Sequence, residues 1–367
     1  MFYMPFKPPD HVNPSGDLIT GRELRDSLLA AGHSVNIASD LRSRWIYWKP
    51  GALLRLQKER RRIRTTLKAS PSDLWFTYHS YYKAPDMLGP HCSMQGRIPY
   101  VIFQGIYSTK RRRSLATLPG FLLNRKALLT ARLVYTNKRS DERNLARLLP
   151  RERLCYIAPG IHPEEFDFDG AARAELRNRW QVGDRVVIFT AAMFRPGVKT
   201  RGVKQVLASC ATLKRAGRDL FLVVAGDGHS RTELEAQARQ DLGPDHLFLG
   251  KIPRHDLHRY YSAADLFAFP GIQESLGMVY LEAQAAGLPV VAFADWGAAE
   301  AVIDRRTGLL SPADQPDRFT ASIGALLENR DMRRKLGAEA RRHIRENHDI
   351  SENYRLMIAS LERIARP

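Results

Sequence analysis

The fold of this chain is decided by the stretch from Pro270 to Pro289, whose sequence is PGIQESLGMVYLEAQAAGLP. The apolar run 266–269 before it predicts a strand, a loop is expected around Glu274, and a helix is expected to begin near Met278. The first backbone N–H groups of such a helix have no partner within it and lie at the positive end of its dipole. The stretch therefore predicts a strand–loop–helix unit of a parallel α/β sheet that can bind a diphosphate at the helix N-terminus.

Two glutamates of this stretch are candidates for binding hydroxyl groups of a ligand. Glu274 lies in the loop, where its carboxylate can accept hydrogen bonds from sugar hydroxyls. Glu282 lies about one turn into the helix, a position suited to a ribose diol, because two carboxylate oxygens match two O–H donors. Gly277 has no side chain and lets the backbone approach a ligand closely. The alternative is that both glutamates are surface residues at an ordinary helix start.

The order of strand, glycine-bearing loop and helix recurs along the chain. Strands are predicted near 2–6, 34–38, 74–78, 100–103, 133–136, 186–190, 221–225, 247–249, 266–269 and 289–292. A segment rich in turn-forming residues, 158–163, separates the two halves. The pattern predicts an α/β fold of two Rossmann-like domains, residues 1–165 and 166–348, followed by a tail at 349–367.

The charge balance is strongly basic, with 57 Lys and Arg against 39 Asp and Glu and a formal net charge of +18. Much of the excess lies in residues 58–64 and 110–113. Three interpretations stay open. The basic runs are an ordinary solvated surface, or they face an anionic membrane or acidic acceptor, or they bind nucleic acid. The last is disfavoured because no RNA- or DNA-binding motif accompanies the charge.

The expected compartment is the cytoplasm. The sequence has no uninterrupted apolar run of the roughly 18–20 residues that a membrane-spanning helix needs, and residues 1–6 do not resemble a signal peptide. Cys92, Cys155 and Cys210 are scattered and lack metal-ligand spacing, so we expect free thiols and no metal. Contact with the cytoplasmic face of an inner membrane is expected if the basic runs bind lipid.

The pattern Pro-Gly-x-x-Glu-Ser-x-Gly-x-x-x-x-Glu-Ala-x-Ala-x-Gly-x-Pro-Val-Val, from Pro270 to Val291, resembles the donor-site signature of family 4 retaining glycosyltransferases. The resemblance spans nearly the whole chain and is most specific from about Val186 to Leu310. It implies the GT-B fold, in which two Rossmann-like domains face each other across a cleft. It also implies that the tail returns to the N-terminal domain, and that a sugar leaves a nucleoside diphosphate with retained configuration. The lack of a plausible Asp-x-Asp metal clamp and the presence of an Arg and Lys pair favour a reaction without metal, and no cofactor besides the donor is expected.

The same resemblance implies roles for individual residues. Arg195 and either Lys199 or Arg201 would bind the donor pyrophosphate, the second position being open because Arg201-Gly202 stands where the family has Lys-Gly. Gln104 replaces a histidine found near the reacting centre, and His79 is a candidate to fill that role. The residues expected to contact the donor are Ser15, Gly16, Gly226, Ile252, Glu274, Ser275, Leu276, Gly277, Met278 and Glu282.

The expected function is a hexosyl transfer from a nucleoside diphosphate sugar to a hydroxyl of a glycan or glycolipid. The setting would be cell-envelope polysaccharide or lipopolysaccharide biosynthesis. A nucleotide-sugar epimerase on the same fold is the alternative, and a basic nucleic-acid-binding protein is a more distant one. Which sugar, which nucleotide base and which acceptor are used stay open.

Overall fold

The computed structural model describes residues 1–11 and 16–366 and divides the chain into two compact units. Unit 1 comprises Met1–Ala158 together with the segment that begins at Ser351, and unit 2 comprises Pro159–Ile350. The chain therefore passes between the units twice, after Ala158 and after Ile350. The first passage lies seven residues before the boundary expected after residue 165.

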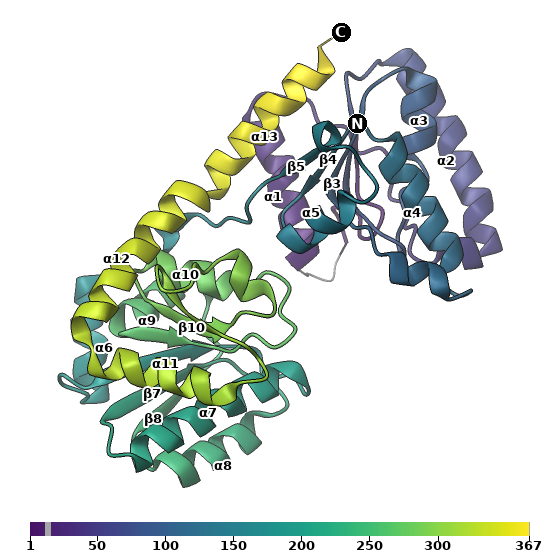
Figure 1. The fold of residues 1–367 in the computed structure, drawn as a ribbon. Coiled ribbons are helices and arrows are strands. Elements are labelled where there is room, and N and C mark those ends of the chain that lie inside the picture. The colour runs from purple at the N-terminus through teal and green to yellow at the C-terminus, as the bar shows by residue number, and fades with distance from the viewer. Residues whose placement is uncertain (12–15, 367) are drawn as a thin grey trace. The chain divides into compact units, whose positions relative to one another are not determined.

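Unit 1 is built on a parallel sheet with the strand order β1-β2-β3-β4-β5. Figure 1 labels β3, β4 and β5 of this sheet. Its strands are β1 (Phe2–Tyr3), β2 (Trp75–Ser80), β3 (Tyr100–Gly105), β4 (Leu133–Thr136) and β5 (Leu154–Tyr156). Its helices are α1 (Gly16–Ala30), α2 (Pro50–Ala69), α3 (Gly89–Gly96), α4 (Leu118–Thr130), α5 (Arg139–Leu145) and α13 (Ile350–Ala365), with the short 3-10 helices η1 (Ile46–Trp48) and η2 (Thr109–Arg113). All six residues of β2 are buried, as expected for a central strand of a parallel sheet.

Two strand predictions in unit 1 need correction. The strand expected at 2–6 ends at Tyr3, before Pro5, which has no N–H to donate to a neighbouring strand. The strand expected at 34–38 is reduced to a single parallel bridge between Phe2 and Ile37. Most of that segment is exposed to solvent, so alternating apolar residues there have little core to bury.

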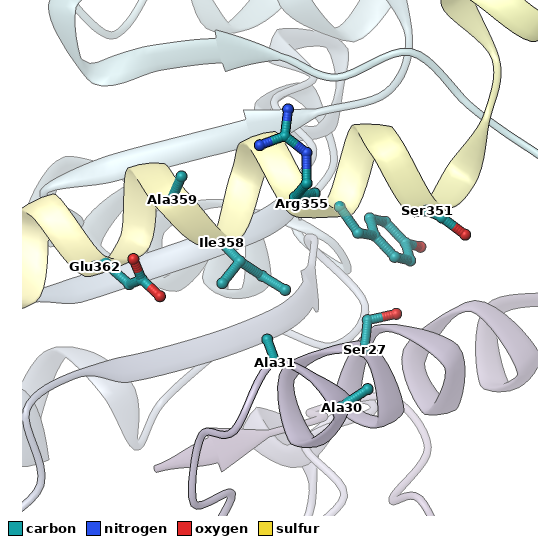
Figure 2. Close-up of a pocket in the computed structure, with 9 residues that line it drawn as sticks. Ser27, Ala30, Ala31, Ser351, Arg355, Ile358, Ala359 and Glu362 are labelled. Carbon is teal, nitrogen blue, oxygen red and sulfur yellow. The ribbon is translucent and has the colours of Figure 1, made fainter.

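Helix α13 packs beside α1 within unit 1, and the two helices border a cavity of about 390 Å³ (Figure 2). Small side chains such as Ala30 and Ala359 line it, and the His33 Nε2 and Glu362 Oε1 atoms lie 3.2 Å apart nearby. The Tyr354 ring, also in α13, meets the edge of Phe103 in the sheet. These contacts place the C-terminal helix in unit 1.

Unit 2 has a parallel sheet with the order β11-β10-β9-β6-β7-β8. Its strands are β6 (Val186–Ala191), β7 (Leu220–Ala225), β8 (His246–Gly250), β9 (Leu266–Ala268), β10 (Val290–Phe293) and β11 (Gly308–Ser311). Its helices are α6 (Gly170–Trp180), α7 (Val198–Arg215), α8 (Arg231–Leu242), α9 (Leu257–Ala263), α10 (Met278–Ala285), α11 (Pro316–Glu328) and α12 (Arg330–Asn347) (Figure 1). The strand order reverses between β6 and β9, and the carboxyl ends of strands at such a switch point form the usual ligand crevice.

Within residues 1–11 and 16–366, every helix is too short or too polar to cross a membrane. This agrees with the absence of a long apolar run in the sequence.

The end of α12 is tied to the beginning of unit 2 by a buried histidine. The Ile161 N–H donates to the His348 carbonyl at 2.9 Å, and the Ile350 N–H donates to the Ile161 carbonyl at 2.8 Å. The His348 ring Nδ1 lies 2.6 Å from the Pro159 carbonyl, and its Nε2 lies 3.2 Å from Nε2 of His343. Burial lowers the pKa of His348 to about 4.

This histidine predicts a loss of stability in mild acid. In the unfolded chain, His348 has an ordinary pKa of about 6.5, so the unfolded state binds the proton first as the pH falls. The stabilisation is complete above pH 6.5 and is lost progressively between pH 6.5 and about 4, for a total of about 3 kcal/mol. We expect the melting temperature to fall over this window in the wild type and to fall less in His348→Asn. Parallel pH profiles of the two proteins would contradict the assignment.

Candidate active site

The loop between β9 and α10 lies at the switch point of unit 2 and folds around a buried tyrosine. Gly271 and Gly277 both have φ of +67°. A Cβ at Gly277 would lie 2.3 Å from the Tyr280 ring, and a Cβ at Gly271 would lie 2.0 Å from its hydroxyl oxygen. That hydroxyl donates to the Phe269 carbonyl at 3.1 Å. Packing against Tyr280 therefore requires both glycines, a reason that the sequence did not reveal.

Helix α10 begins at Met278, as predicted, with Gly277 as its N-cap and without a side-chain capping hydrogen bond. The backbone of Ser275 and Leu276 lies against Gly297, where a Cβ would come within 2.8 Å of both residues. The Gly297 N–H also donates to the Glu274 carbonyl at 3.1 Å. The loop is thus held by its neighbours, and the N-terminus of α10 is available to an anionic ligand.

Glu274 forms an ion pair with Lys199, which lies in the first turn of α7. Both side chains are largely buried, 20% and 27% exposed, and the Lys199 Nζ lies 5.5 Å from the centre of the Phe269 ring. The pair therefore joins the loop after β9 to the segment after β6, the two strands between which the order reverses. The structure brings together these two residues that the sequence singled out separately.

Arg195 and Arg201 are close to Lys199 in the sequence, and both are exposed cations. Neither side chain has a hydrogen bond or an ion pair within the described part of the chain. Lys199 and Arg201 are two residues apart on α7, and such residues do not share a helix face. The structure thus distinguishes them, because Lys199 is committed to Glu274 and Arg201 is not.

Glu282 is nearly buried, with 5% of its side chain exposed. One carboxylate oxygen accepts a hydrogen bond from the Tyr261 hydroxyl at 3.0 Å, and the other lies 3.3 Å from Arg254. Burial raises the pKa of Glu282, and Arg254 and the Tyr261 hydrogen bond oppose that rise. The sequence did not indicate either partner, because Tyr261 and Arg254 lie 21 and 28 residues away and carry no motif of their own.

The glycine turn after β7 supports the loop that carries Arg195. Gly226 has φ of +139°, and a Cβ there would lie 1.8 Å from the Ala192 carbonyl oxygen. The Phe194 N–H donates to the Asp227 carbonyl at 2.9 Å, and the Gly226 N–H donates to the Gly250 carbonyl at 2.8 Å. These contacts give Gly226 a structural role. Its contact with the donor stays a prediction. Ile252, further along, is half-buried against the core of unit 2.

The remaining candidates lie in unit 1. Ser15 is outside the described residues, and Gly16 is the first residue of α1. His79 and Gln104 occupy neighbouring positions at the carboxyl ends of β2 and β3, between the paired residues Tyr78–Phe103 and Ser80–Gly105.

Both of these strand-end residues have left-handed backbone conformations, with φ of 63° at His79 and 57° at Gln104. The His79 ring stacks on Tyr81 at 4.8 Å. Burial raises the pKa of Asp141, and the charges of Lys138 and His79 oppose that rise. Non-glycine residues in this conformation store strain and cluster at functional sites, which keeps His79 and Gln104 as candidates for acceptor chemistry.

No group of three His, Cys, Asp or Glu side chains suited to a metal occurs among residues 1–11 and 16–366. The model for the family described as glycosyl transferases group 1 matches residues 174–343, which contain the whole constellation in unit 2. Unit 2 therefore resembles the group 1 glycosyltransferases over these residues.

A curated relative agrees with this match. A GDP-mannose-dependent alpha-(1-6)-phosphatidylinositol monomannoside mannosyltransferase of Mycobacterium tuberculosis is 33% identical over 200 residues, covering 52% of this chain and 51% of the relative. The chain thus spans about half the length of the curated relatives it matches.

Solved structures extend the likeness to both units. Sucrose-phosphate synthase from Thermosynechococcus elongatus aligns over 99% of this chain and 98% of its own, with a TM-score of 0.71 and 20% identity. WaaG, a glycosyltransferase involved in lipopolysaccharide biosynthesis, aligns over 97% and 98% with a TM-score of 0.64 and 17% identity. The fold of this chain is the α/β GT-B fold of glycosyltransferases, as predicted.

Proposed function

We propose that the chain is a retaining glycosyltransferase that moves a sugar from a nucleoside diphosphate sugar to a hydroxyl of a glycan or glycolipid. One observation carries the proposal. The Lys199–Glu274 ion pair joins the segment after β6 to the loop after β9 at the switch point of unit 2. The first segment also carries two exposed arginines, and the second leads into the N-terminus of α10. Cations and a helix N-terminus suit a pyrophosphate, and carboxylates suit the hydroxyls of sugar and ribose.

Each residue then has a distinct proposed role. Arg195 and Arg201 neutralise the negative charge that develops on the leaving diphosphate as the glycosidic bond breaks. Lys199 positions Glu274, whose carboxylate accepts hydrogen bonds from the donor sugar. Glu282, held by Tyr261, binds the ribose. No metal or cofactor is needed in this scheme, because side-chain cations and backbone N–H groups stabilise the leaving group.

The donor and the linkage can be tested together. UDP-, GDP- and ADP-sugars would be incubated with a glycolipid extract, and the anomeric configuration of any product would be determined by NMR. GDP-mannose is the first donor to try, because the mannosyltransferase relative depends on it. Transfer with retained configuration supports the proposal. Inverted product would exclude a retaining enzyme, and conversion of a sugar nucleotide without acceptor would instead indicate an epimerase.

We further propose that the acceptor lies at an anionic membrane, as in cell-envelope or lipopolysaccharide biosynthesis. Between Asp86 and Asp141 the chain has ten Lys and Arg and no Asp or Glu, and between Asp40 and Glu59 it has five and none. Such carboxylate-free segments favour an anionic partner.

These two segments meet in unit 1 and expose large apolar side chains. The Trp48 indole N–H donates to the Ala116 carbonyl at 3.1 Å, which joins η1 to the loop after η2. Trp48, Leu54 and Leu115 are 57%, 76% and 83% exposed, next to the basic residues 110–113. We call Trp48, Leu54, Leu115 and Lys110–Arg113 the apolar-basic surface. Proteins that bind an anionic bilayer typically insert apolar side chains into it and place cations around them. Binding to nucleic acid does not explain the exposed leucines.

The apolar-basic surface predicts vesicle binding that depends on both charge and leucines. Burying one leucine contributes about 2 kcal/mol, so Leu54→Ser/Leu115→Ser should weaken cosedimentation with anionic vesicles at least about tenfold. Leu356→Ser, at a leucine of α13 that is 54% exposed, is the matched control and should bind as the wild type does. Binding should also decline with added salt. Equal binding by all three proteins would count against this surface.

A further inference from the structure

Unit 2 has a charged cavity at the amino ends of its strands, whereas the candidate active site lies at their carboxyl ends. Asp265 and Pro289, which line this cavity, directly precede β9 and β10. The candidate active site, in contrast, is formed by segments that follow β6 and β9. The cavity has a volume of about 780 Å³. Its charged lining comprises Arg173, Arg177, Asp184, Asp265, Arg330, Arg333 and Arg334.

Two of the five arginines are fixed by one carboxylate. Arg173 and Arg177 each bond a different oxygen of Asp265, at 2.6 and 3.0 Å. The second oxygen also accepts the Val187 N–H at 2.8 Å. The Asp265 carboxylate therefore holds both guanidinium groups to the sheet.

The other three arginines crowd the start of α12. Arg330, Arg333 and Arg334 are spaced three and four residues apart, so they share one helix face, where like charges repel. They also lie near the positive end of the helix dipole, which disfavours cations. Arg330 and Arg334 are exposed and have no ion-pair or hydrogen-bond partner within the described part of the chain.

Arg333 is held between these groups and the preceding helix. It donates to the Leu327 carbonyl at 3.0 Å. Burial lowers the pKa of Arg333, the charge of Asp265 opposes that fall, and the charges of Arg330 and Arg173 lower the pKa further. The cavity thus gathers five guanidinium groups against two carboxylates, an arrangement whose repulsion a bound anion would relieve.

We infer that this cavity binds a small oligophosphate anion of the pyrophosphate class. Guanidinium groups bind phosphate oxygens through paired N–H donors, and several of them around one cavity favour more than one phosphate group. The anion site is separate from the proposed donor site and does not depend on the proposed function. Free pyrophosphate and the diphosphate of a nucleotide share the recognised chemistry.

The test is a calorimetric titration with inorganic pyrophosphate on the wild type and two double variants. Arg330→Gln/Arg334→Gln removes two exposed guanidinium groups from the cavity, and Arg195→Gln/Arg201→Gln removes two from the candidate active site. We expect Arg195→Gln/Arg201→Gln to keep one saturable pyrophosphate site, the cavity. Arg330→Gln/Arg334→Gln should bind pyrophosphate at the cavity at least tenfold more weakly than the wild type does. Neither variant should melt below the wild type without ligand, since all four side chains are exposed. Arg330→Gln/Arg334→Gln should melt at the same or a higher temperature, because it removes two mutually repelling charges.

The outcomes separate this inference from the proposed function. If pyrophosphate binding is unchanged in Arg330→Gln/Arg334→Gln and disappears in Arg195→Gln/Arg201→Gln, the cavity site is excluded while the donor site stands. The inference is also overturned if the wild type binds no pyrophosphate at millimolar concentrations of this anion. A titration of Arg195→Gln/Arg201→Gln with GDP in the presence of pyrophosphate identifies the natural ligand. If GDP competes with pyrophosphate for the cavity, the ligand is a nucleotide. If GDP does not compete, the ligand is a free oligophosphate.

Discussion

Replacing Arg201 with alanine is expected to lower the turnover of sugar transfer by about 10²–10³-fold, the cost of removing one group that stabilises transition-state charge. Arg201 lies in the first turn of α7, exposed and without an ion-pair partner in the described residues, so its guanidinium can approach the leaving diphosphate. The substrate concentration for half-maximal rate should change less than turnover, because the charge develops mainly in the transition state. Steady-state kinetics on the purified protein measure both.

The control for Arg201→Ala lies on the same helix. Arg215, at the far end of α7, is remote from the switch point, and Arg215→Ala should transfer sugar at the wild-type rate. Lys199→Ala should act mainly through Glu274, by releasing the carboxylate that Lys199 holds. If Lys199→Ala abolishes turnover while Arg201→Ala is nearly silent, the roles assigned to these two cations are reversed.

Gly226→Ala is expected to be the most destabilising single change in unit 2. The new Cβ would lie 1.8 Å from a backbone carbonyl oxygen, at a φ of +139° that side chains rarely adopt. A backbone carbonyl group cannot move aside as a flexible side chain can. We therefore expect Gly226→Ala to lower the free energy of unfolding by about 3 kcal/mol or more. The turn must shift away from Ala192, which would also displace the loop that carries Arg195.

A second glycine provides the matched comparison. Gly217 also has a positive φ, +76°, but a Cβ there meets nothing within 4 Å. Gly217→Ala should therefore cost only the backbone strain, about 1 kcal/mol. Chemical denaturation of the two variants measures the difference. Equal destabilisation would mean that strain alone, and not the approach of Ala192, determines the need for glycine at position 226.

The parts of the molecule that were predictable from sequence are those with local signals. The strand, loop and helix start around Met278 follow from apolar runs and turn residues within twenty positions. The strand expected at 34–38 failed because its alternating apolar pattern lies at an exposed edge of unit 1. Alternation alone does not show whether a core is present on one side.

The parts that sequence could not predict depend on residues distant in the chain. Nothing near Glu282 identifies Tyr261 or Arg254 as its partners, since only the fold brings α9 and the preceding turn to α10. The pairing of Lys199 with Glu274 likewise spans 75 residues. One signal was available for the arginine-lined cavity, because three arginines at the start of a helix oppose its dipole.

The most direct test of the central claim, that unit 2 binds a nucleoside diphosphate sugar through Glu282, is calorimetric binding of GDP-mannose, UDP-glucose and ADP-glucose to the wild type and Glu282→Gln. Tyr261→Phe, which removes one hydrogen bond to the carboxylate and keeps the charge, serves as control. We predict that sugar nucleotides of one nucleotide class bind to the wild type. Glu282→Gln should lower their affinity about 10- to 100-fold, because a charge-assisted hydrogen bond is lost. Tyr261→Phe should lower the affinity less. Equal affinity in Glu282→Gln and the wild type, or no binding of any sugar nucleotide, would contradict the account.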